Sequence, residues 1–234
     1  MANRSDLARR VSSILDPAQV RGRAGSGWIA IGLLLSVAVV SAIAPDFAVT
    51  RTYGQTVQAR KATSARSNAL NEGLLKATQS GRTNEIKELL DSGADINGLV
   101  EGDGTALIVA AREGHKSIVE LLLAHGADPN LSAPGDGSPL IMAAREGNDS
   151  IVELLISKGA QINQIVEGDE SPLIQASSEG RLSTVKLLIS HGADVNLRAF
   201  SGGQDGEWRT ALIMARRNGH TAVVETLVQS GGRE

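Results

Sequence analysis

The chain repeats itself with a period of 33 residues, and this feature limits its fold more than any other. A similar ten-residue block begins at Thr105, Ser138, Ser171 and Thr210, with spacings of 33, 33 and 39 residues, and a degenerate copy covers 72–81. A second helical pattern follows each block. Periods of this length are typical of solenoids whose units each contribute two helices and a loop. We therefore predict an all-α solenoid of five repeats: 72–104, 105–137, 138–170, 171–209 and 210–234.

Recurring positions within the repeat have recognisable physical tasks. The hydroxyl side chain that opens each block can cap the first helix, and Pro139 and Pro172 suit its first turn, where the missing N–H costs nothing. Small alanines allow neighbouring first helices to approach closely. Glycines in a left-handed conformation suit the turns between and after the helices. The glycines predicted for these turns are Gly81, Gly114, Gly147, Gly180 and Gly219 between the helices, and Gly93, Gly126, Gly159, Gly192 and Gly231 after them.

These motifs resemble the ankyrin-repeat family, whose pattern runs T-P-L-H-x-A-A, then G-H, L-L and G-A-D-x-N. The resemblance covers 72–234 and implies helix–turn–helix units joined by finger loops. It also implies a protein or peptide partner and no catalytic activity. One departure is systematic, because isoleucine replaces the histidine of T-P-L-H at Ile108, Ile141, Ile174 and Ile213. An apolar residue of similar size can fill the same position.

The amino-terminal third has a different character. Residues 28–44 contain no charge, and they follow a basic, amphipathic segment, 1–27, that ends its helical pattern at Pro17. Two interpretations stay open: a single membrane-spanning helix, or a signal peptide cleaved after Ala44. Arginines before the span favour a cytoplasmic amino terminus and extracytoplasmic (periplasmic) repeats. If cleavage occurs, the repeats would be secreted or periplasmic. Residues 45–71 are predicted to be a linker, partly helical near the first repeat.

The segment 7–17, together with the following span, resembles the last-span region of integral-membrane sensor metallopeptidases, some of which carry ankyrin repeats after that span. The chain contains no H-E-x-x-H motif. This resemblance implies an alternative function, namely the sensor part of a bacterial antirepressor-type system without its protease.

Composition excludes several kinds of chemistry. The chain has no cysteine, so it can form neither a disulfide nor a thiolate metal site. Residues 1–71 hold 9 basic and 3 acidic side chains, a balance of +6, whereas 72–234 hold 14 and 23, a balance of −9. An acidic repeat region is unsuited to binding nucleic acid. The four histidines follow the repeat, as structural residues do, and we expect no cofactor, no metal and a monomeric repeat domain.

Carboxylates and glycines recur in the loops between repeats. They can be turn residues, contacts to a basic partner, or both, although their spacing lacks the ligand number that Ca²⁺ needs. The acidic candidates for partner binding are Glu101, Asp103, Asp136, Glu167 and Asp169.

A six-residue insertion lengthens the fourth loop and holds Phe200 and Trp208, the only aromatic residues after Tyr53. Trp and Arg dominate binding hot spots, so Phe200, Trp208 and Arg209 are candidate anchors. Alternatively, the two rings stabilise a hairpin by packing on each other. The first helices form the other candidate surface. One position there varies in chemistry within a fixed scaffold, at Val109, Met142, Gln175 and Met214, and Arg112 and Arg145 lie next to it.

Overall fold

The computed structural model describes residues 49–168, 170–200 and 206–233, with side chains from residue 62 onward. The chain divides into two units, Met1–Lys61 and Ala62–Glu234, and all five predicted repeats lie in the second. The predicted basic segment 1–27 and the predicted span 28–44 lie outside the described residues. Within the described ranges, no helix is both long and apolar enough to cross a membrane.

Helix α3 runs without interruption from Val49 to Gln79. Most of the segment predicted as a linker is therefore helical, and the last part of α3 serves as the first helix of the first repeat. Ala, Gln, Arg and Lys are good helix formers, and no proline interrupts this stretch. The helix lacks a strong apolar face, which explains why the sequence pattern predicted only partial helicity here.

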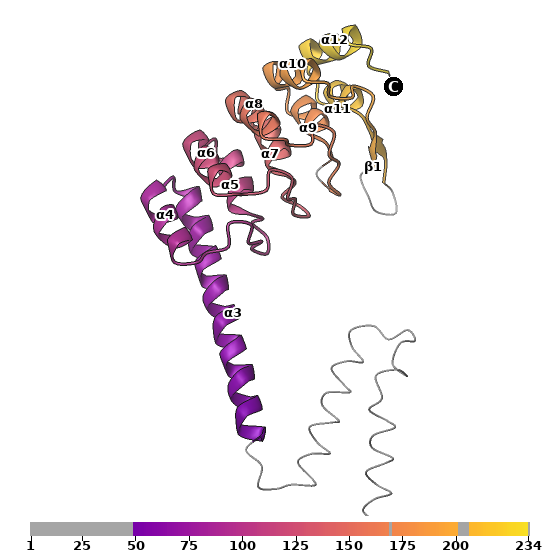
Figure 1. The fold of residues 1–234 in the computed structure, drawn as a ribbon. Coiled ribbons are helices and arrows are strands. Elements are labelled where there is room, and N and C mark those ends of the chain that lie inside the picture. The colour runs from indigo at the N-terminus through magenta and orange to yellow at the C-terminus, as the bar shows by residue number, and fades with distance from the viewer. Residues whose placement is uncertain (1–48, 169, 201–205, 234) are drawn as a thin grey trace, which may run out of the picture. The chain divides into compact units, whose positions relative to one another are not determined.

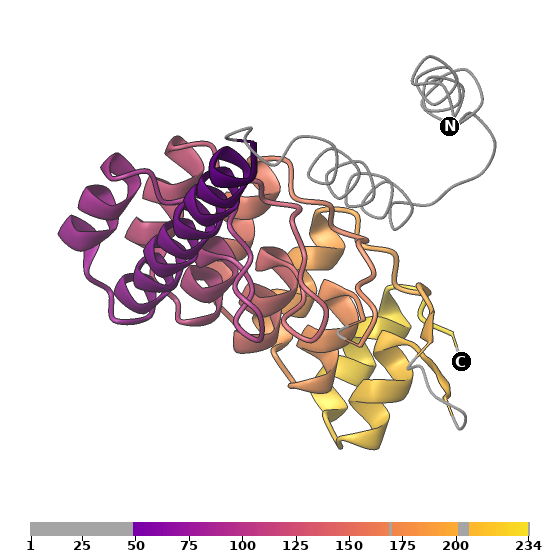
Figure 2. The same cartoon turned by 90° about the horizontal axis from the view of Figure 1, so that it is seen from below.

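Eleven further elements, nine helices and two short strands, complete the repeats in the described part of the chain. Each repeat holds one helix in each of two layers, and neighbouring helices of the same layer contact each other (Figure 1). In the view from below, the colours follow one another stepwise, because repeats adjacent in sequence are adjacent in space (Figure 2). The elements are α4 (Thr83–Asp91), α5 (Ala106–Arg112), α6 (Lys116–Ala124), α7 (Pro139–Glu146), α8 (Asp149–Ser157), α9 (Pro172–Ser178), α10 (Leu182–Ser190), β1 (Ala199–Phe200), β2 (Trp208–Arg209), α11 (Ala211–Arg217) and α12 (Thr221–Gln229).

The predicted caps and turns are confirmed. The side chains of Thr105, Ser138, Ser171 and Thr210 each accept a hydrogen bond from the backbone N–H three residues later, at 3.2–3.4 Å. Prolines occupy the first turn of α7 and α9. All ten glycines predicted for the turns have φ between 69° and 93°. A side chain at such a φ is strained, so glycine is the residue that closes these turns most easily.

The main hydrophobic core lies between the two helix layers. Alanines of the first helices are fully buried, and they allow the close approach that the sequence predicted. Branched residues of the second helices, such as Val119 and Leu122, fill the space between layers. The fully buried alanines are Ala110, Ala143, Ala176 and Ala215.

Five asparagines, four in the loops after the second helices and Asn71 in α3, join neighbouring parts of the stack. Each side-chain oxygen accepts a hydrogen bond from a backbone N–H 24 to 37 residues further along the chain. These bonds satisfy backbone groups that no helix pairs, and they fix the register between repeats. The pairs are Asn71 with Asp95, Asn97 with Asp128, Asn130 with Gln161, Asn163 with Asp194, and Asn196 with Arg233.

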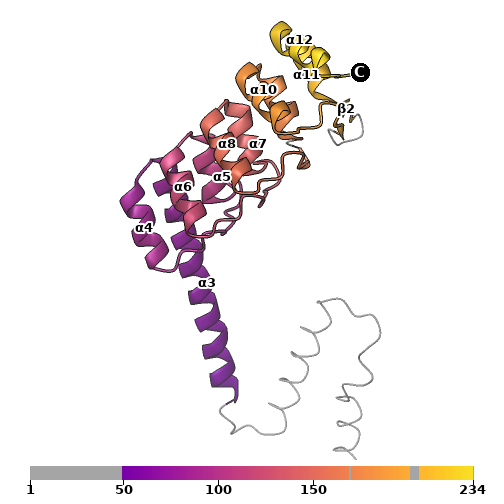
Figure 3. The same cartoon turned by 45° about the horizontal axis from the view of Figure 1, so that its top comes forward.

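Four finger loops, 98–104, 131–137, 164–170 and 197–209, lie at the same edge of the stack in their described parts, which exclude 169 and 201–205 (Figure 3). The first three close through single antiparallel bridges, Val100–Gly104, Ala133–Gly137 and Val166–Glu170. The fourth closes through the short antiparallel pair of β1 and β2.

The isoleucines that replace the usual histidine support the fingers. Ile108 and Ile141 are fully buried and form a second apolar cluster with Met142 and with Ala133 and Val166 of the fingers. Apolar packing therefore does here what hydrogen bonds from histidine would otherwise do.

Candidate functional site

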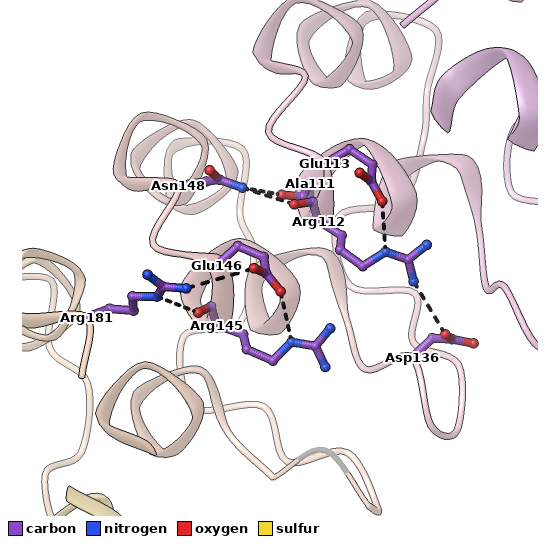
Figure 4. Close-up of polar contacts among 8 residues, drawn as sticks. All are labelled: Ala111, Arg112, Glu113, Asp136, Arg145, Glu146, Asn148 and Arg181. Carbon is purple, nitrogen blue, oxygen red and sulfur yellow. Dashed lines mark hydrogen bonds and ion pairs between the residues drawn. The ribbon is translucent and has the colours of Figure 1, made fainter. Parts of the chain in front are cut away.

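In the last four repeats, the residue after the inter-helix glycine contacts the end of the preceding repeat's first helix. Asn148 Nδ2 donates to the carbonyl oxygens of Ala111 (2.9 Å) and Arg112 (3.3 Å), and Arg181 Nε donates to that of Arg145 (3.0 Å) (Figure 4). These bonds satisfy carbonyls that the end of an α-helix leaves unpaired. His115 and His220 occupy the same position and contact the carbonyl oxygens of Gln79 and Ser178. The interpretation of these two histidines as structural is thereby confirmed.

Charged side chains at the ends of the first helices are largely compensated. Arg112 lies 3.3 Å from Glu113 and 3.8 Å from Asp136, and Arg145 lies 3.2 Å from Glu146 (Figure 4). Asp136 therefore turns back toward its own scaffold, although the sequence suggested a free acid at a finger tip. Such partly exposed pairs contribute modestly to stability, and they leave little net charge on this part of the surface.

The finger acids are not equivalent. Glu101, Asp103 and Glu167 are exposed and make no ion pair within the described part of the chain. Asp169 lies outside the described residues. The first and third fingers thus carry uncompensated negative charge, whereas the charge of the second is shared with Arg112.

Glu170 differs from these acids because its side chain is buried. It adopts φ 64°, and it is the only residue other than glycine with positive φ in the described ranges. The first two fingers have glycines at this position, Gly104 and Gly137, with φ of 74° and 66°. A left-handed conformation costs a residue with a side chain about 1–2 kcal/mol.

An ion pair across neighbouring repeats compensates Glu170. Arg209 Nη1 lies 2.7 Å from Glu170 Oε1, and the Glu170 side chain is only 4% exposed. The pKa of Arg209 is raised, mainly because its side chain donates a hydrogen bond to Glu170. Burial of the guanidinium acts in the opposite direction, whereas the negative charges of Glu170 and Glu207 raise the pKa further. Arg209 Nε lies 3.5 Å from Glu207, which also pairs with Arg217.

The fourth finger presents its aromatic side chains to solvent. Phe200 and Trp208 face each other across the β1–β2 pair, with ring centroids 5.4 Å apart and planes tilted by 59°. The guanidinium of Arg198 lies 5.3 Å from the Trp208 ring centroid, within the range of a cation–π interaction. Even so, Phe200 and Trp208 are 47% and 54% exposed. The rings stabilise the hairpin and remain available for contact, so the two interpretations of the sequence are compatible.

The predicted variable position on the first helices is mostly inside the molecule. Val109 and Met142 are 2% and 1% exposed, so Met142 has almost no surface to offer a partner. Gln175 is half-buried. The reason is the second apolar cluster, because the fingers cover this position in the inner repeats.

The structure also shows a groove that the sequence did not reveal. It lies where the last part of α3 meets the first finger and α5, and Glu72, Leu75, Lys76, Leu99 and Val100 are among its lining residues. The available signal was an apolar pair, Leu99 and Val100, in a loop of otherwise glycine and acidic residues. The wall of the groove includes Asn68 and Asn71, which were predicted to belong to a linker. No group of three or more His, Asp or Glu side chains is placed to hold a metal in the part of the chain that is described.

Stacked helix pairs, left-handed glycines between them and projecting fingers define a helical-repeat solenoid protein. Comparison with known protein families agrees with this class. Profiles of ankyrin repeats match residues 55–133 and 132–199 (three copies) and residues 173–228 (many copies). The chain belongs to the ankyrin-repeat family. No curated protein matched the chain.

Ankyrin repeats act in protein–protein interaction, and neither matched profile describes a catalytic family. The matches begin at residue 55, so they do not bear on the predicted membrane segment. The resemblance of residues 1–45 to sensor metallopeptidases receives no support from them and stays a prediction.

Proposed function

We propose that this chain is a single-pass membrane protein whose ankyrin repeats bind a protein partner outside the cytoplasm, with the fourth finger as the main anchor. The observation that carries this proposal is an exposed aromatic pair on a rigidly held support. Phe200 and Trp208 leave about half of their surface in solvent, while Arg209, beside Trp208, is paired with Glu170 of the preceding finger.

Holding the rings in place favours binding. A partner that covers them loses little conformational entropy at this surface, because the hairpin and the Arg198 contact already restrict the Trp208 side chain. Tryptophan and arginine side chains are enriched in binding hot spots, and both occur here within one finger. Arg112, Arg145, Gln175 and the exposed finger acids would form the polar surroundings of this contact.

Tethering is proposed from the sequence. Residues 28–44 carry no charge, and the arginines before them favour an amino terminus on the cytoplasmic side. The test is a topology reporter fused after Glu234, combined with amino-terminal sequencing of the mature protein. Reporter activity on the cytoplasmic side would contradict the proposed location of the repeats outside the cytoplasm. A new amino terminus after Ala44 would contradict the membrane-spanning helix.

The partner contact is tested by recovering proteins from an extract of the source organism with the full chain as bait. Trp208→Ala is expected to lower partner recovery about tenfold or more, because a hot-spot residue carries a large share of the binding energy. Val228→Ala is the matched control, since Val228 is 49% exposed on α12, away from the fingers. Unchanged recovery with Trp208→Ala would remove the fourth finger from the proposal.

The sensor role in a metallopeptidase system remains a second hypothesis, carried by the segment 7–17 and the span that follows it. A protease gene immediately upstream, with its reading frame ending before Met1, would favour it. An upstream region without such a gene would favour the first hypothesis, in which the chain is a membrane-tethered binding protein.

A further inference from the structure

The groove at the first finger is a second candidate surface, separate from the fourth finger. Two adjoining hollows form it and share Glu72 and Val100. One wall is α3, including residues that precede the first repeat, and the other is the first finger. None of the aromatic residues of the fourth finger takes part.

The groove contains an apolar contact surface. Leu99 is 54% exposed, and it is one of five large apolar side chains left so exposed within the described ranges. Val100 is half-buried beside it, and Leu75 and Val109 lie deeper in the lining. Leu99 is exposed next to other apolar side chains. A partner side chain that packs on it would remove apolar surface from water, which favours binding.

The charge around Leu99 is negative. Glu72, Glu101 and Asp103 line the groove, are exposed, and make no ion pair with other described residues. The two basic residues of the lining do not balance them, because Arg112 is already compensated by Glu113 and Asp136. Only Lys76 remains to oppose three carboxylates. A groove with one sign of charge and apolar walls attracts the opposite charge.

These features select among possible occupants. The carboxylates repel nucleic acids and anionic lipid surfaces, and an acidic peptide would meet the same repulsion. A second copy of this acidic repeat region would bring like charges together. A cationic peptide segment with an apolar side chain satisfies both the carboxylates and Leu99.

We propose that the first-finger groove binds a cationic segment of a partner protein, with lysine or arginine side chains at Glu72, Glu101 and Asp103 and an apolar side chain against Leu99. This site goes beyond the fourth-finger contact, and neither depends on the other.

The test uses the full chain in phosphatidylcholine nanodiscs, whose neutral surface does not attract cationic peptides, and measures fluorescence anisotropy of labelled five-residue peptides. The probes are Lys-Lys-Leu-Lys-Lys, the same peptide with serine in place of leucine, and Glu-Glu-Leu-Glu-Glu. We expect the leucine peptide to bind roughly tenfold more tightly than the serine peptide, because burying one leucine is worth about that factor. The acidic peptide should not bind.

Variants then assign the binding to the groove. The triple substitution Glu72→Gln, Glu101→Gln and Asp103→Asn should weaken binding of the leucine peptide at least about tenfold. The control triple substitution Glu120→Gln, Glu153→Gln and Glu225→Gln changes net charge equally at exposed positions of the second helices, and it should leave binding unchanged. Leu99→Ser should abolish the preference for leucine over serine. Glu101→Lys with Asp103→Lys should shift the preference toward the acidic peptide.

Each other outcome overturns the proposal. Equal weakening by the two triple variants would mean that only net charge attracts the peptide. Equal binding of the leucine and serine peptides would contradict the apolar contact with Leu99. No binding of either peptide would contradict the site as a whole. If binding appears only after Arg9, Arg10, Arg21 and Arg23 are changed to Gln, the occupant is the chain's own basic segment and not a partner. That result would also contradict the proposed topology, which places this segment and the groove on opposite sides of the membrane. Trp208→Ala should not affect peptide binding, so failure here is distinguishable from failure of the fourth-finger contact.

Discussion

The second and fourth fingers occupy equivalent places in the repeat but are closed by different interactions. The second ends in Gly137, whose left-handed backbone lies so close to the core that an added Cβ would be 2.8 Å from Met142 Cε. The fourth ends in Arg209, which lies in a strand and pairs with Glu170 of the third finger. The second finger is therefore fixed by backbone geometry and apolar packing within its surroundings. The fourth depends on a charge pair between residues 39 positions apart.

This difference separates stability from function. The second finger is short, packs on the isoleucine cluster through Ala133 and presents no large apolar side chain to solvent. The fourth finger carries an insertion and exposes Phe200 and Trp208. The ion pair of Arg209 with Glu170 fixes the end of this finger against the third finger. A long loop can thus present large apolar side chains without losing its position. The predictions that follow test the two kinds of closure separately.

The largest effect is expected from Ile141→Ala, which removes a fully buried side chain from the cluster beneath the second finger. Substitutions of this kind leave a cavity and lower the free energy of unfolding by about 2–5 kcal/mol. Urea denaturation followed by circular dichroism measures the change. Ile213→Ala is the matched control, because Ile213 has the same place in the last repeat but is only half-buried. Equal losses at both positions would contradict a special role for the cluster.

Arg209→Ala removes the ion pair that closes the fourth finger. It leaves the Glu170 carboxylate buried and unpaired, and the expected loss is about 1.5–3 kcal/mol of unfolding free energy. Glu170→Gly in the same chain should recover much of this loss, because glycine adopts the left-handed backbone without strain, as Gly104 and Gly137 do. A double-mutant cycle by denaturation gives the coupling between the two residues, and strict additivity would refute the pairing.

Ser177→Ala should act in the opposite direction. Ser177 is fully buried, and its hydroxyl has no hydrogen-bond partner among the described residues, whereas the second and third repeats have Ala111 and Ala144 at this position. Removing an unsatisfied hydroxyl is expected to raise the unfolding free energy by about 1 kcal/mol. A rise in the thermal midpoint would show it. A fall would mean that the hydroxyl is paired in solution.

A comparably small effect on stability, in the destabilising direction, is expected from Trp208→Ala. The ring is about half exposed, so the loss should stay near 0.5–1.5 kcal/mol, the contribution of an aromatic pair. The same substitution is expected to reduce partner recovery strongly. A small change in the thermal midpoint together with a large loss of binding would confirm that the two roles of the finger are separable. A large loss of stability would instead make Trp208 a structural residue of the hairpin.

Much of the fold was predictable because its signals are local. The cap at Thr105 bonds to an N–H three residues away, and the glycine at 147 closes the turn next to it. Such interactions depend on neighbours in the sequence and recur with the repeat. The helical state of the predicted linker from Val49 onward was only partly anticipated, since that helix has no strong apolar face.

The candidate site was less predictable because its contacts join distant residues. The sequence treated Asp136, Met142 and Arg209 as possible partner contacts. Asp136 lies beside Arg112, Met142 is buried, and Arg209 is paired with Glu170. One signal was present, namely opposite charges in consecutive repeats, Glu170 and Arg209, at the position before the helix cap where earlier repeats have glycine.

By itself, the sequence determined the class of fold, the number of repeats, the ends of the helices from Thr105 onward, and the unusual aromatic content of the fourth finger. These follow from period, capping and glycine positions, whose energies act over a few residues. Only the tertiary structure decided which side chains face solvent: that Met142 supports a finger, that Leu99 lines a groove with α3, and that Glu170 keeps a strained backbone through Arg209. Exposure and charge pairing depend on which repeats and fingers lie next to each other, and that arrangement exists only in the folded stack.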